Sequence, residues 1–311
     1  MDSNHTSFEN FRTAFLPFVF DKPEVAKIFE IALLIRGHIL IEDFPGIGKT
    51  TIAKAFAKLI GYSFSRIQGT SDSLPQDILG GEIFDFEQKQ FSIKKGPIFQ
   101  ELVLIDEINR MHPKTQSAFL QCMEEQKVSL AGIEYELPDH HLIIATQNPI
   151  EYAGTFPLPE AQRDRFACFV KIGYPSTETQ KNILRQGGKI RLNEIIEALE
   201  SPITKVELTK LQIEVQGIFI KDSILDGLIR FADWTRNEAG FQYGISPRGL
   251  DLFVRAMKAN AFLSNRDFVI PEDGIDLVVP FLLHRIALQH EIGTSQSIQS
   301  LLQEKYAEFL G

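Results

Sequence analysis

Three short apolar runs, each ending in polar residues, constrain the fold of this chain more than any other feature of its sequence. They are "HILIED" (38–43), "LVLIDE" (102–107) and "HLIIATQNP" (141–149). Continuous apolar runs of this length are typical of strands in a parallel sheet, because helices cover both faces of such a sheet. Helical patterns occupy the intervening segments 50–60 and 115–125. The alternation predicts an α/β domain with a parallel sheet.

Two segments interrupt this alternation with strand-like patterns. Residues 82–96 predict a hairpin with its turn near Glu87 to Gln90, and residues 127–138 predict a second hairpin that turns near Ala131 and Gly132. The simplest interpretation is surface decoration. Both hairpins nevertheless come just before strands that end in candidate catalytic residues.

The helical period takes over after "IGYPSTETQ" (172–180), whose glycine, proline and serine are typical of a boundary. We therefore expect an α/β core with two hairpin inserts over residues 1–174 and a small all-helical domain over residues 175–311. A sequence of 311 residues is long enough for one large and one smaller domain.

The second domain is predicted to contain three clear helices. The first spans 223–236. The second spans 246–263, where Ser246 is a good N-cap and Pro247 suits the first helical position. The third spans 271–288 and is expected to kink at Pro280, since proline removes a helical hydrogen bond.

The composition of the chain argues against several classes of protein. The net charge of −9 argues against a general nucleic-acid binder, whose surface is usually basic. Two cysteines, Cys122 and Cys168, are too few for a disulfide framework or a metal set. The N-terminal residues lack the pattern of a signal peptide, and no apolar stretch reaches the ~18 residues that a membrane helix needs. A cytoplasmic protein without a membrane span is expected.

The segment "IEDFPGIGKTT" (41–51) has the context of a phosphate-binding loop, because it follows a predicted strand and leads into a predicted helix. Gly46 and Gly48 would let backbone N–H groups surround phosphate oxygens. Lys49 would reach the β- and γ-phosphates, and the Thr50 hydroxyl would bind Mg²⁺. The alternative is an ordinary glycine-rich turn. The candidate nucleotide-binding residues of the loop are Pro45, Gly46, Ile47, Gly48, Lys49, Thr50 and Thr51.

One position of this loop departs from the pattern Gly-x-x-x-x-Gly-Lys-[Ser/Thr]. The first glycine should be residue 43, which is aspartate. Since that glycine commonly has a positive φ, and aspartate is one of the few other residues that tolerate left-handed backbone, we expect Asp43 to be accommodated there.

A strand-end carboxylate pair is the second element of a nucleotide site. Asp106 closes "LVLID" and is the candidate to hold Mg²⁺ together with Thr50. Glu107 follows directly and is the candidate base for an attacking water. Acidic residues often end strands, so this pair alone is a weak signal. Together with Lys49 and Thr50 upstream, it indicates a nucleotide site.

Three further residues complete the candidate set. Asn148 closes the next strand and could position the attacking water, although asparagine before a proline is also a common turn residue. Arg165 could act as an arginine finger on a neighbouring subunit, or simply pair with Asp164 at the surface. Arg248, in the first turn of a predicted helix, could reach the γ-phosphate from the helical domain or could be a solvated arginine at a helix start. A positive charge there opposes the helix dipole, which hints at a partner.

Together these segments resemble the MoxR family of AAA+ ATPases, in the clade with a helix-2 insert and a pre-sensor hairpin. The resemblance covers residues 37–290 and is specific, because several blocks fall in order. The blocks are "GPIFQELVLIDEINRMHPKTQSAFLQCMEEQKV" (96–128), "IIATQNPIEYAGTFPLPEAQRDRF" (143–166), "YGISPRG" (243–249) and "HRIAL" (284–288).

The resemblance implies a P-loop AAA+ core followed by a helical lid, with ATP and Mg²⁺ as ligands. It implies that Asn148 is the sensor asparagine, Arg165 the finger that acts across a subunit boundary and Arg248 the lid arginine. It also implies a homo-oligomeric ring, typically a hexamer, that remodels, assembles or activates a partner protein, often one with a von Willebrand A-type domain. Both hairpins would face the pore or the partner.

The chain departs from the family at Arg163, where an apolar residue is usual, so either Arg163 or Arg165 could reach the neighbouring site. Residues 19–25 lack the Gly-Gln that usually contacts adenine. Two other functions remain open: a DNA-directed motor, which the acidic balance disfavours, and a nucleotide-gated scaffold with little turnover.

Overall fold

The structure is a computed structural model that describes residues 3–20, 22–44, 46–87, 89–149, 155–185, 188–238, 240–288 and 295–310. The chain forms two compact units that interleave along the sequence. The first comprises residues 1–26, 40–158 and 171–205, and the second comprises 27–39, 159–170 and 206–311. The boundary expected between residues 174 and 175 stays a prediction.

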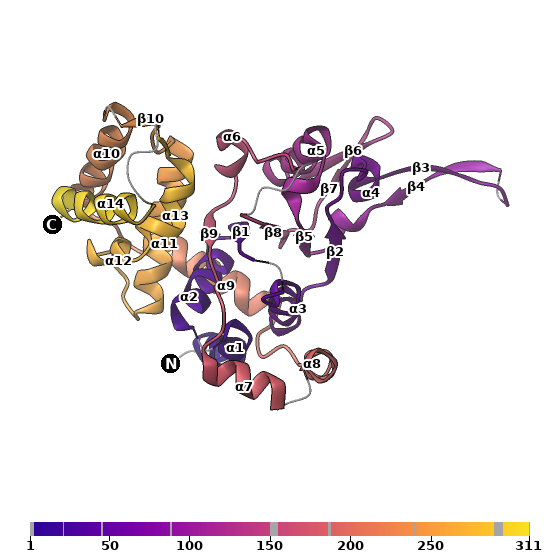
Figure 1. Ribbon diagram of the computed structural model, residues 1–311, viewed down its shortest axis with the longest axis horizontal. Coiled ribbons are helices and arrows are strands. Elements are labelled where there is room, and N and C mark those ends of the chain that lie inside the picture. Colours follow the sequence, from indigo (N-terminus) through magenta and orange to yellow (C-terminus); the bar gives the residue numbers. More distant parts are fainter. Residues whose placement is uncertain are drawn as a thin grey trace. The chain divides into compact units, whose positions relative to one another are not determined.

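A five-stranded sheet has the strand order β2-β5-β8-β1-β9 (Figure 1). Strands β2 and β5 pair in parallel, as do β5 and β8. The three apolar runs of the sequence form β1, β5 and β8, so the expected parallel α/β sheet is confirmed. The strands of this sheet are β1 (Ile39–Glu42), β2 (Phe64–Gln68), β5 (Leu102–Asp106), β8 (Leu142–Gln147) and β9 (Cys168–Val170).

The helices of the first unit position the sheet and the loop that follows β1. Helix α3 packs against β5, α1 and α8. On the α1 side, the ring of Phe15 lies 5.0 Å from that of Phe56, in an edge-on arrangement that aromatic pairs favour. The helices that lie wholly in this unit are α1 (Ser3–Phe15), α3 (Lys49–Leu59), α4 (Pro75–Leu79), α5 (Pro113–Glu125), α7 (Thr177–Arg185) and α8 (Gly188–Glu197).

Both expected hairpins are confirmed. Strands β3 (Gly80–Asp85) and β4 (Gln90–Lys95) pair antiparallel in a long arm that extends beyond α4 (Figure 1). Strands β6 (Lys127–Leu130) and β7 (Ile133–Glu136) form the shorter hairpin. Ala131 and Gly132 make its turn with φ of 49° and 80°, as a tight hairpin turn requires.

The second unit is mostly helical, and α10, α11, α13 and α14 pack on one another in it. A short antiparallel pair, β10 (Phe241–Tyr243) and β11 (Ala287–Leu288), adds to the helices. The helices from residue 159 onward in this unit are α6 (Glu160–Arg163), α9 (Lys205–Gly217), α10 (Asp222–Asn237), α11 (Pro247–Leu263), α12 (Glu272–Ile275), α13 (Val278–Leu282) and α14 (Ser295–Leu310), while α2 (Pro23–Leu34) precedes β1.

The prediction of one continuous helix over 271–288 is wrong. The segment forms α12, α13, a 3₁₀ turn at Leu283–Arg285 and strand β11. Helix α12 ends at Ile275 and α13 begins at Val278, so the break lies just before Pro280, whose ring and missing N–H disfavour helix over the preceding turn. The segment is therefore broken before the proline instead of kinked at it.

None of the described helices is long and apolar enough to cross a membrane.

Candidate functional site

The loop between β1 and α3 has the backbone that phosphate binding requires. Gly46 has φ of 87°, Gly48 has φ of 83°, and both values favour glycine. A Cβ added at Gly46 would have no heavy atom within 4 Å, so the space above the loop is open. Gly48 is the N-cap of α3 and supplies no side-chain cap, which leaves the N–H groups of the first turn for an anion.

Asp43 does not have the left-handed backbone that we expected, since it is absent from the residues with positive φ. Its buried carboxylate instead accepts hydrogen bonds from three backbone N–H groups. The Oδ1 atom accepts from Phe44, and Oδ2 accepts from Ile172 at 2.7 Å and from Gly173 at 2.5 Å. Aspartate thus stands at the first glycine position of the motif as an anchor between the loop and the segment that follows β9.

Lys49 points into the loop that precedes it. Its Nζ donates to the Asp43 carbonyl oxygen at 2.5 Å. Burial lowers the pKa of Lys49, and the neighbouring carboxylates of Asp43 and Asp106 oppose that shift. A desolvated ammonium group that is held beside a bare loop is a good ligand for phosphate oxygens.

Asp106 closes β5 beside the hydroxyl groups of two threonines. Thr50 Oγ1 donates to Asp106 Oδ2 at 3.2 Å, and Thr146 Oγ1 donates to Oδ1 at 3.3 Å. A third contact comes from Arg66 of β2, whose Nε donates to Oδ2 at 2.7 Å. The hydroxyl oxygen of Thr50 and the carboxylate of Asp106 are hard oxygen ligands of the kind that Mg²⁺ prefers, so this pair fits a magnesium ion.

Glu107 has a left-handed backbone, with φ of 58° and ψ of 50°. Such a conformation is costly for a residue other than glycine and often marks a functional position. Its carboxylate accepts from Gln68 Nε2 and from Arg110, both at 2.9 Å. Gly69 follows Gln68 and permits this approach, since a Cβ there would lie 2.3 Å from the Glu107 carbonyl oxygen.

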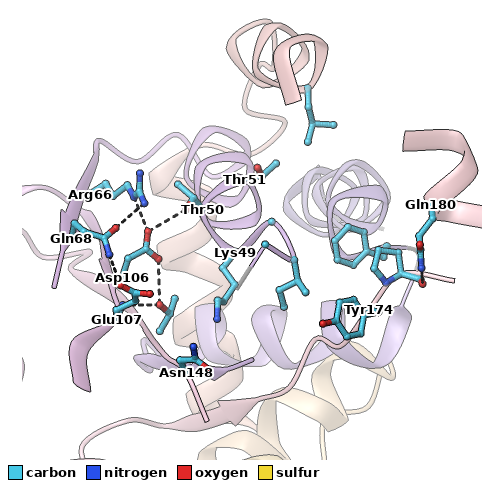
Figure 2. A pocket seen from close by; sticks show the side chains of 17 residues that line it. Lys49, Thr50, Thr51, Arg66, Gln68, Asp106, Glu107, Asn148, Tyr174 and Gln180 are labelled. Carbon is cyan, nitrogen blue, oxygen red and sulfur yellow. Dashed lines mark hydrogen bonds and ion pairs between the residues drawn. The ribbon is translucent and has the colours of Figure 1, made fainter. Parts of the chain in front are cut away.

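These side chains line one cavity of about 640 Å³ in the first unit. Figure 2 shows Asp106 and Glu107 at one end, Tyr174 and Gln180 at the other, and Lys49 between them. Pro45 lies outside the described residues. The predicted residues that the structure brings together in this cavity are Gly46, Ile47, Gly48, Lys49, Thr50, Thr51, Asp106, Glu107 and Asn148.

The far end of the cavity consists of residues that the sequence analysis missed. Phe20, Tyr174, Pro175 and Leu192 supply apolar surface, and Gln180 supplies an amide. Phe20 has a left-handed backbone with φ of 61°. The sequence offered little signal for this end, because Phe20 and Tyr174 are 154 positions apart and the second lies where a domain boundary was expected.

Asn148 lies beyond β8 and lines the cavity on the side of the carboxylates (Figure 2). Its carbonyl oxygen accepts from Asn109 Nδ2 at 3.3 Å. The water-positioning role of Asn148 and its alternative role as a turn residue both stay predictions.

Arg165 and Arg248 belong to the second unit. Asp164 forms an ion pair with the buried guanidinium of Arg285. The alternative pairing of Asp164 with Arg165 stays a prediction. Ser246 Oγ, at the N-cap of α11, also donates to Asp164 Oδ2 at 2.9 Å. The carboxylate of Asp164, next to Arg165 in the chain, therefore binds the start of the helix that carries Arg248.

Arg285 holds the backbone on either side of Arg165. It donates to the carbonyl oxygen of Asp164 at 2.6 Å and to that of Phe166 at 2.5 Å. Burial lowers the pKa of Arg285, and the charge of Asp164 opposes that shift. Arg163 is engaged elsewhere, in an ion pair with Glu160 at 3.3 Å.

The cysteines and histidines fit structural roles. Cys122 and Cys168 are buried and free, and burial raises the pKa of both thiols, to about 11 for Cys122. His141 is buried, and a ring nitrogen lies 2.9 Å from the Ile98 carbonyl oxygen. Within the described part of the chain, no three His, Cys, Asp or Glu side chains cluster as a metal site.

The loop, the strand-end carboxylates and the cavity that they line define a phosphate-loop nucleotide site on a parallel α/β sheet. Two family models agree with this class. The ATPase family associated with various cellular activities (AAA) matches residues 38–168, and the AAA lid domain matches residues 234–304.

Comparison with individual relatives places the chain in a family within this class. Chaperone MoxR1 of Mycobacterium tuberculosis is 36% identical over 84% of this chain and 70% of that protein. The uncharacterised protein YeaC of Bacillus subtilis is 44% identical over 87% of this chain and 83% of that protein. A crystal structure of a protein assigned as an ATPase, from Cytophaga hutchinsonii, superposes with a TM-score of 0.86 at 31% identity, covering 97% of this chain and 94% of that one.

The chain belongs to the MoxR family of AAA+ ATPases. It is an ATPase with an α/β P-loop core and a helical AAA lid, as its sequence predicted.

Proposed function

We propose that this chain works as a ring-forming, chaperone-like ATPase in which the cavity of the first unit binds and hydrolyses ATP. The observation that carries the proposal is the convergence of Lys49, Thr50, Asp106 and Glu107 on one cavity. Lys49 and the N–H groups of the loop would bind the phosphates. Glu107 would take the proton of the attacking water, and Asn148 would orient that water.

Thr50 and Asp106 would hold Mg²⁺, whose charge would help to neutralise the phosphate oxygens during transfer. The distance of 3.2 Å between the Thr50 hydroxyl and Asp106 Oδ2 supports this assignment, because both groups already face the same point.

The apolar end of the cavity would receive the base of the nucleotide. Phe20 and Tyr174 offer aromatic surface for it. The amide of Gln180 is oriented by its own hydrogen bond, since Nε2 donates to the Pro175 carbonyl oxygen at 2.8 Å. The amide oxygen of Gln180 would then accept a hydrogen bond from an amino group on the base, as adenine has and guanine lacks at the same ring position.

Arg165 would complete the site of a neighbouring subunit in a ring, typically a hexamer, and Arg248 would respond to the nucleotide from the lid. The buried contacts of Arg285 on both sides of Arg165 support a fixed presentation of that arginine. By family resemblance we favour Arg165 as the arginine that acts in trans, with Arg163, which forms an ion pair with Glu160, as the alternative.

A protein client would bind the β3–β4 hairpin. Phe86 is 84% exposed and Phe91 is 65% exposed, and both rings contact Phe84. An exposed aromatic cluster of this kind is typical of protein–protein contact. By family resemblance, a protein with a von Willebrand A-type domain is the first client to test. The net charge of −9 makes nucleic acid a poor alternative.

The test is ATP hydrolysis per chain as a function of protein concentration, for wild type, Glu107→Gln and Arg165→Ala. Specific activity is expected to rise with concentration, because the site is completed by a second subunit. Both variants are expected to lose activity by about 100-fold or more, while Arg165→Ala still binds ATP.

Other outcomes decide against parts of this proposal. Activity that is independent of concentration, or an active Arg165→Ala variant, rules out the trans assignment. Binding without turnover at any concentration indicates a nucleotide-gated scaffold. Stimulation by DNA that is lost at high salt indicates a DNA-directed motor.

A further inference from the structure

Asp106, the carboxylate that would hold the metal ion, already forms an ion pair with Arg66. Arg66 lies on β2, two residues before Gln68, which pairs in register with Asp106 of β5. The Nε atom of Arg66 donates to Asp106 Oδ2 at 2.7 Å, and Thr50 Oγ1 donates to the same oxygen atom at 3.2 Å. The guanidinium group therefore occupies the side of Asp106 that faces Thr50 (Figure 2).

The position of this guanidinium group is fixed by a chain of hydrogen bonds. Arg66 Nη2 donates to Gln68 Oε1 at 2.9 Å. Gln68 in turn donates from Nε2 to Glu107 Oε2 at 2.9 Å. The chain links Asp106 to Glu107 through Arg66 and Gln68, so the two strand-end carboxylates are joined by side chains of β2.

Arg66 can nevertheless leave this position. Its side chain is 47% exposed, whereas that of Asp106 is 9% exposed. Strand β2 is at the edge of the sheet, and Arg66 lines the cavity itself. A long side chain on an edge strand can move to the phosphate oxygens of a bound nucleotide, which attract a guanidinium group strongly.

We propose that Arg66 is a tethered counter-ion of Asp106 that competes with Mg²⁺ for this carboxylate. In the absence of nucleotide, Arg66 neutralises Asp106 and keeps Gln68 on Glu107. Because two cations repel each other at one oxygen atom, Arg66 must release Asp106 when the metal–nucleotide complex enters. That release also removes the partner that orients Gln68. The inference rests on the proposed assignment of Thr50 and Asp106 to Mg²⁺.

The test is the affinity for a fluorescent ADP analogue with excess Mg²⁺ and with a chelator, measured for the full chain. The quantity compared is the ratio of the dissociation constant in chelator to that in Mg²⁺. Arg66→Gln keeps a hydrogen-bond donor near Asp106 but removes the charge. The ratio is expected to rise by about 5- to 10-fold in this variant, because the metal no longer meets a competitor and the metal-free nucleotide loses a cation.

Two variants serve as controls. Arg110→Gln removes a positive charge that pairs with Glu107 instead of Asp106, and its ratio is expected to stay within about twofold of wild type. Arg66→Lys retains the charge, and its ratio is expected to stay closer to wild type than that of Arg66→Gln. Circular dichroism confirms that each variant is folded.

An unchanged ratio in a folded Arg66→Gln protein overturns the proposal. Equal weakening of nucleotide binding with and without Mg²⁺ also overturns it, and makes Arg66 a phosphate ligand only. Failure of the underlying assignment has a different signature: wild type itself would show no effect of Mg²⁺ on nucleotide affinity, and the counter-ion role would fall with it.

Discussion

Asp43 Oδ2 lies 2.5 Å from the backbone nitrogen of Gly173, although 130 residues separate the two positions in the sequence. The contact joins the start of the phosphate-binding loop to the segment just before Tyr174. The loop in the middle of the nucleotide cavity and the end that holds Tyr174 are therefore tied to one carboxylate. An aspartate at this position is an anchor of the site, and its mismatch with the usual glycine pattern has a structural reason.

Restoring the glycine should harm the protein. We expect Asp43→Gly to lower the free energy of unfolding by about 2–4 kcal/mol, because three backbone N–H groups lose a charged acceptor in a buried place. Glycine gains nothing from its conformational freedom there, since Asp43 does not have a positive φ. Urea unfolding of both proteins measures the difference. A variant as stable as wild type would show that these hydrogen bonds contribute nothing net.

The exposed phenylalanines of the β3–β4 hairpin should be dispensable for folding. We expect the double change Phe86→Ser and Phe91→Ser to alter the free energy of unfolding by less than about 0.5 kcal/mol, because both rings are mostly in water. Fluorescence of a hydrophobic dye such as bis-ANS should fall by about half, since the main exposed aromatic cluster is gone. Phe219→Ser, at a residue that is 63% exposed in the second unit, is the matched control and should reduce dye binding less. An unchanged dye signal in the hairpin variant would contradict the prediction.

His141 should make stability depend on pH. Burial lowers the pKa of His141 to about 4, below the value of about 6.5 that an unfolded histidine has. Its contribution to stability is therefore fully present above about pH 6.5 and is lost as the pH falls toward 4, because the unfolded chain takes up the proton first. The expected loss is about 2 kcal/mol between about pH 7 and pH 5.

The measurement is urea unfolding of wild type, His141→Gln and His5→Gln at several pH values. His141→Gln should remove about 2 kcal/mol of the pH dependence and leave the part that comes from buried His284, whose pKa burial also lowers, whereas His5→Gln, on α1, should retain the whole dependence. An equally steep dependence in His141→Gln would assign the effect to other groups.

Much of the core could be predicted because its signals are local. Strands β5 and β8 are buried on both faces, so their sequences are continuous apolar runs. Helix α11 begins where Ser246 was expected to cap it, and Ser246 Oγ accepts from the Gly249 N–H at 2.9 Å. The turn of the β6–β7 hairpin was visible in Ala131 and Gly132.

The rest depended on contacts between distant residues. Tyr306 of α14 packs against Gly274 of α12, a contact that no periodicity in the segment 271–288 reveals. The cavity is lined by both Phe20 and Tyr174, which are far apart in the sequence. Arg66 and Gln68 were missed because β2 is a short strand of mixed polarity, in which their polar side chains suggested nothing beyond an exposed edge.

Asp164 has a consequence for how parts of this protein can be exchanged. Its carboxylate binds Ser246 and Arg285, which lie in the lid portion of the chain, while its own backbone carries the loop of Arg165. In a chimera that takes only residues 206–311 from a relative, the relative would supply the residues at positions 246 and 285. Asp164, their partner, would still come from this protein. The unit to exchange is the whole compact unit, residues 27–39, 159–170 and 206–311, so that Arg165 and Arg248 are transplanted together with the residues that hold them.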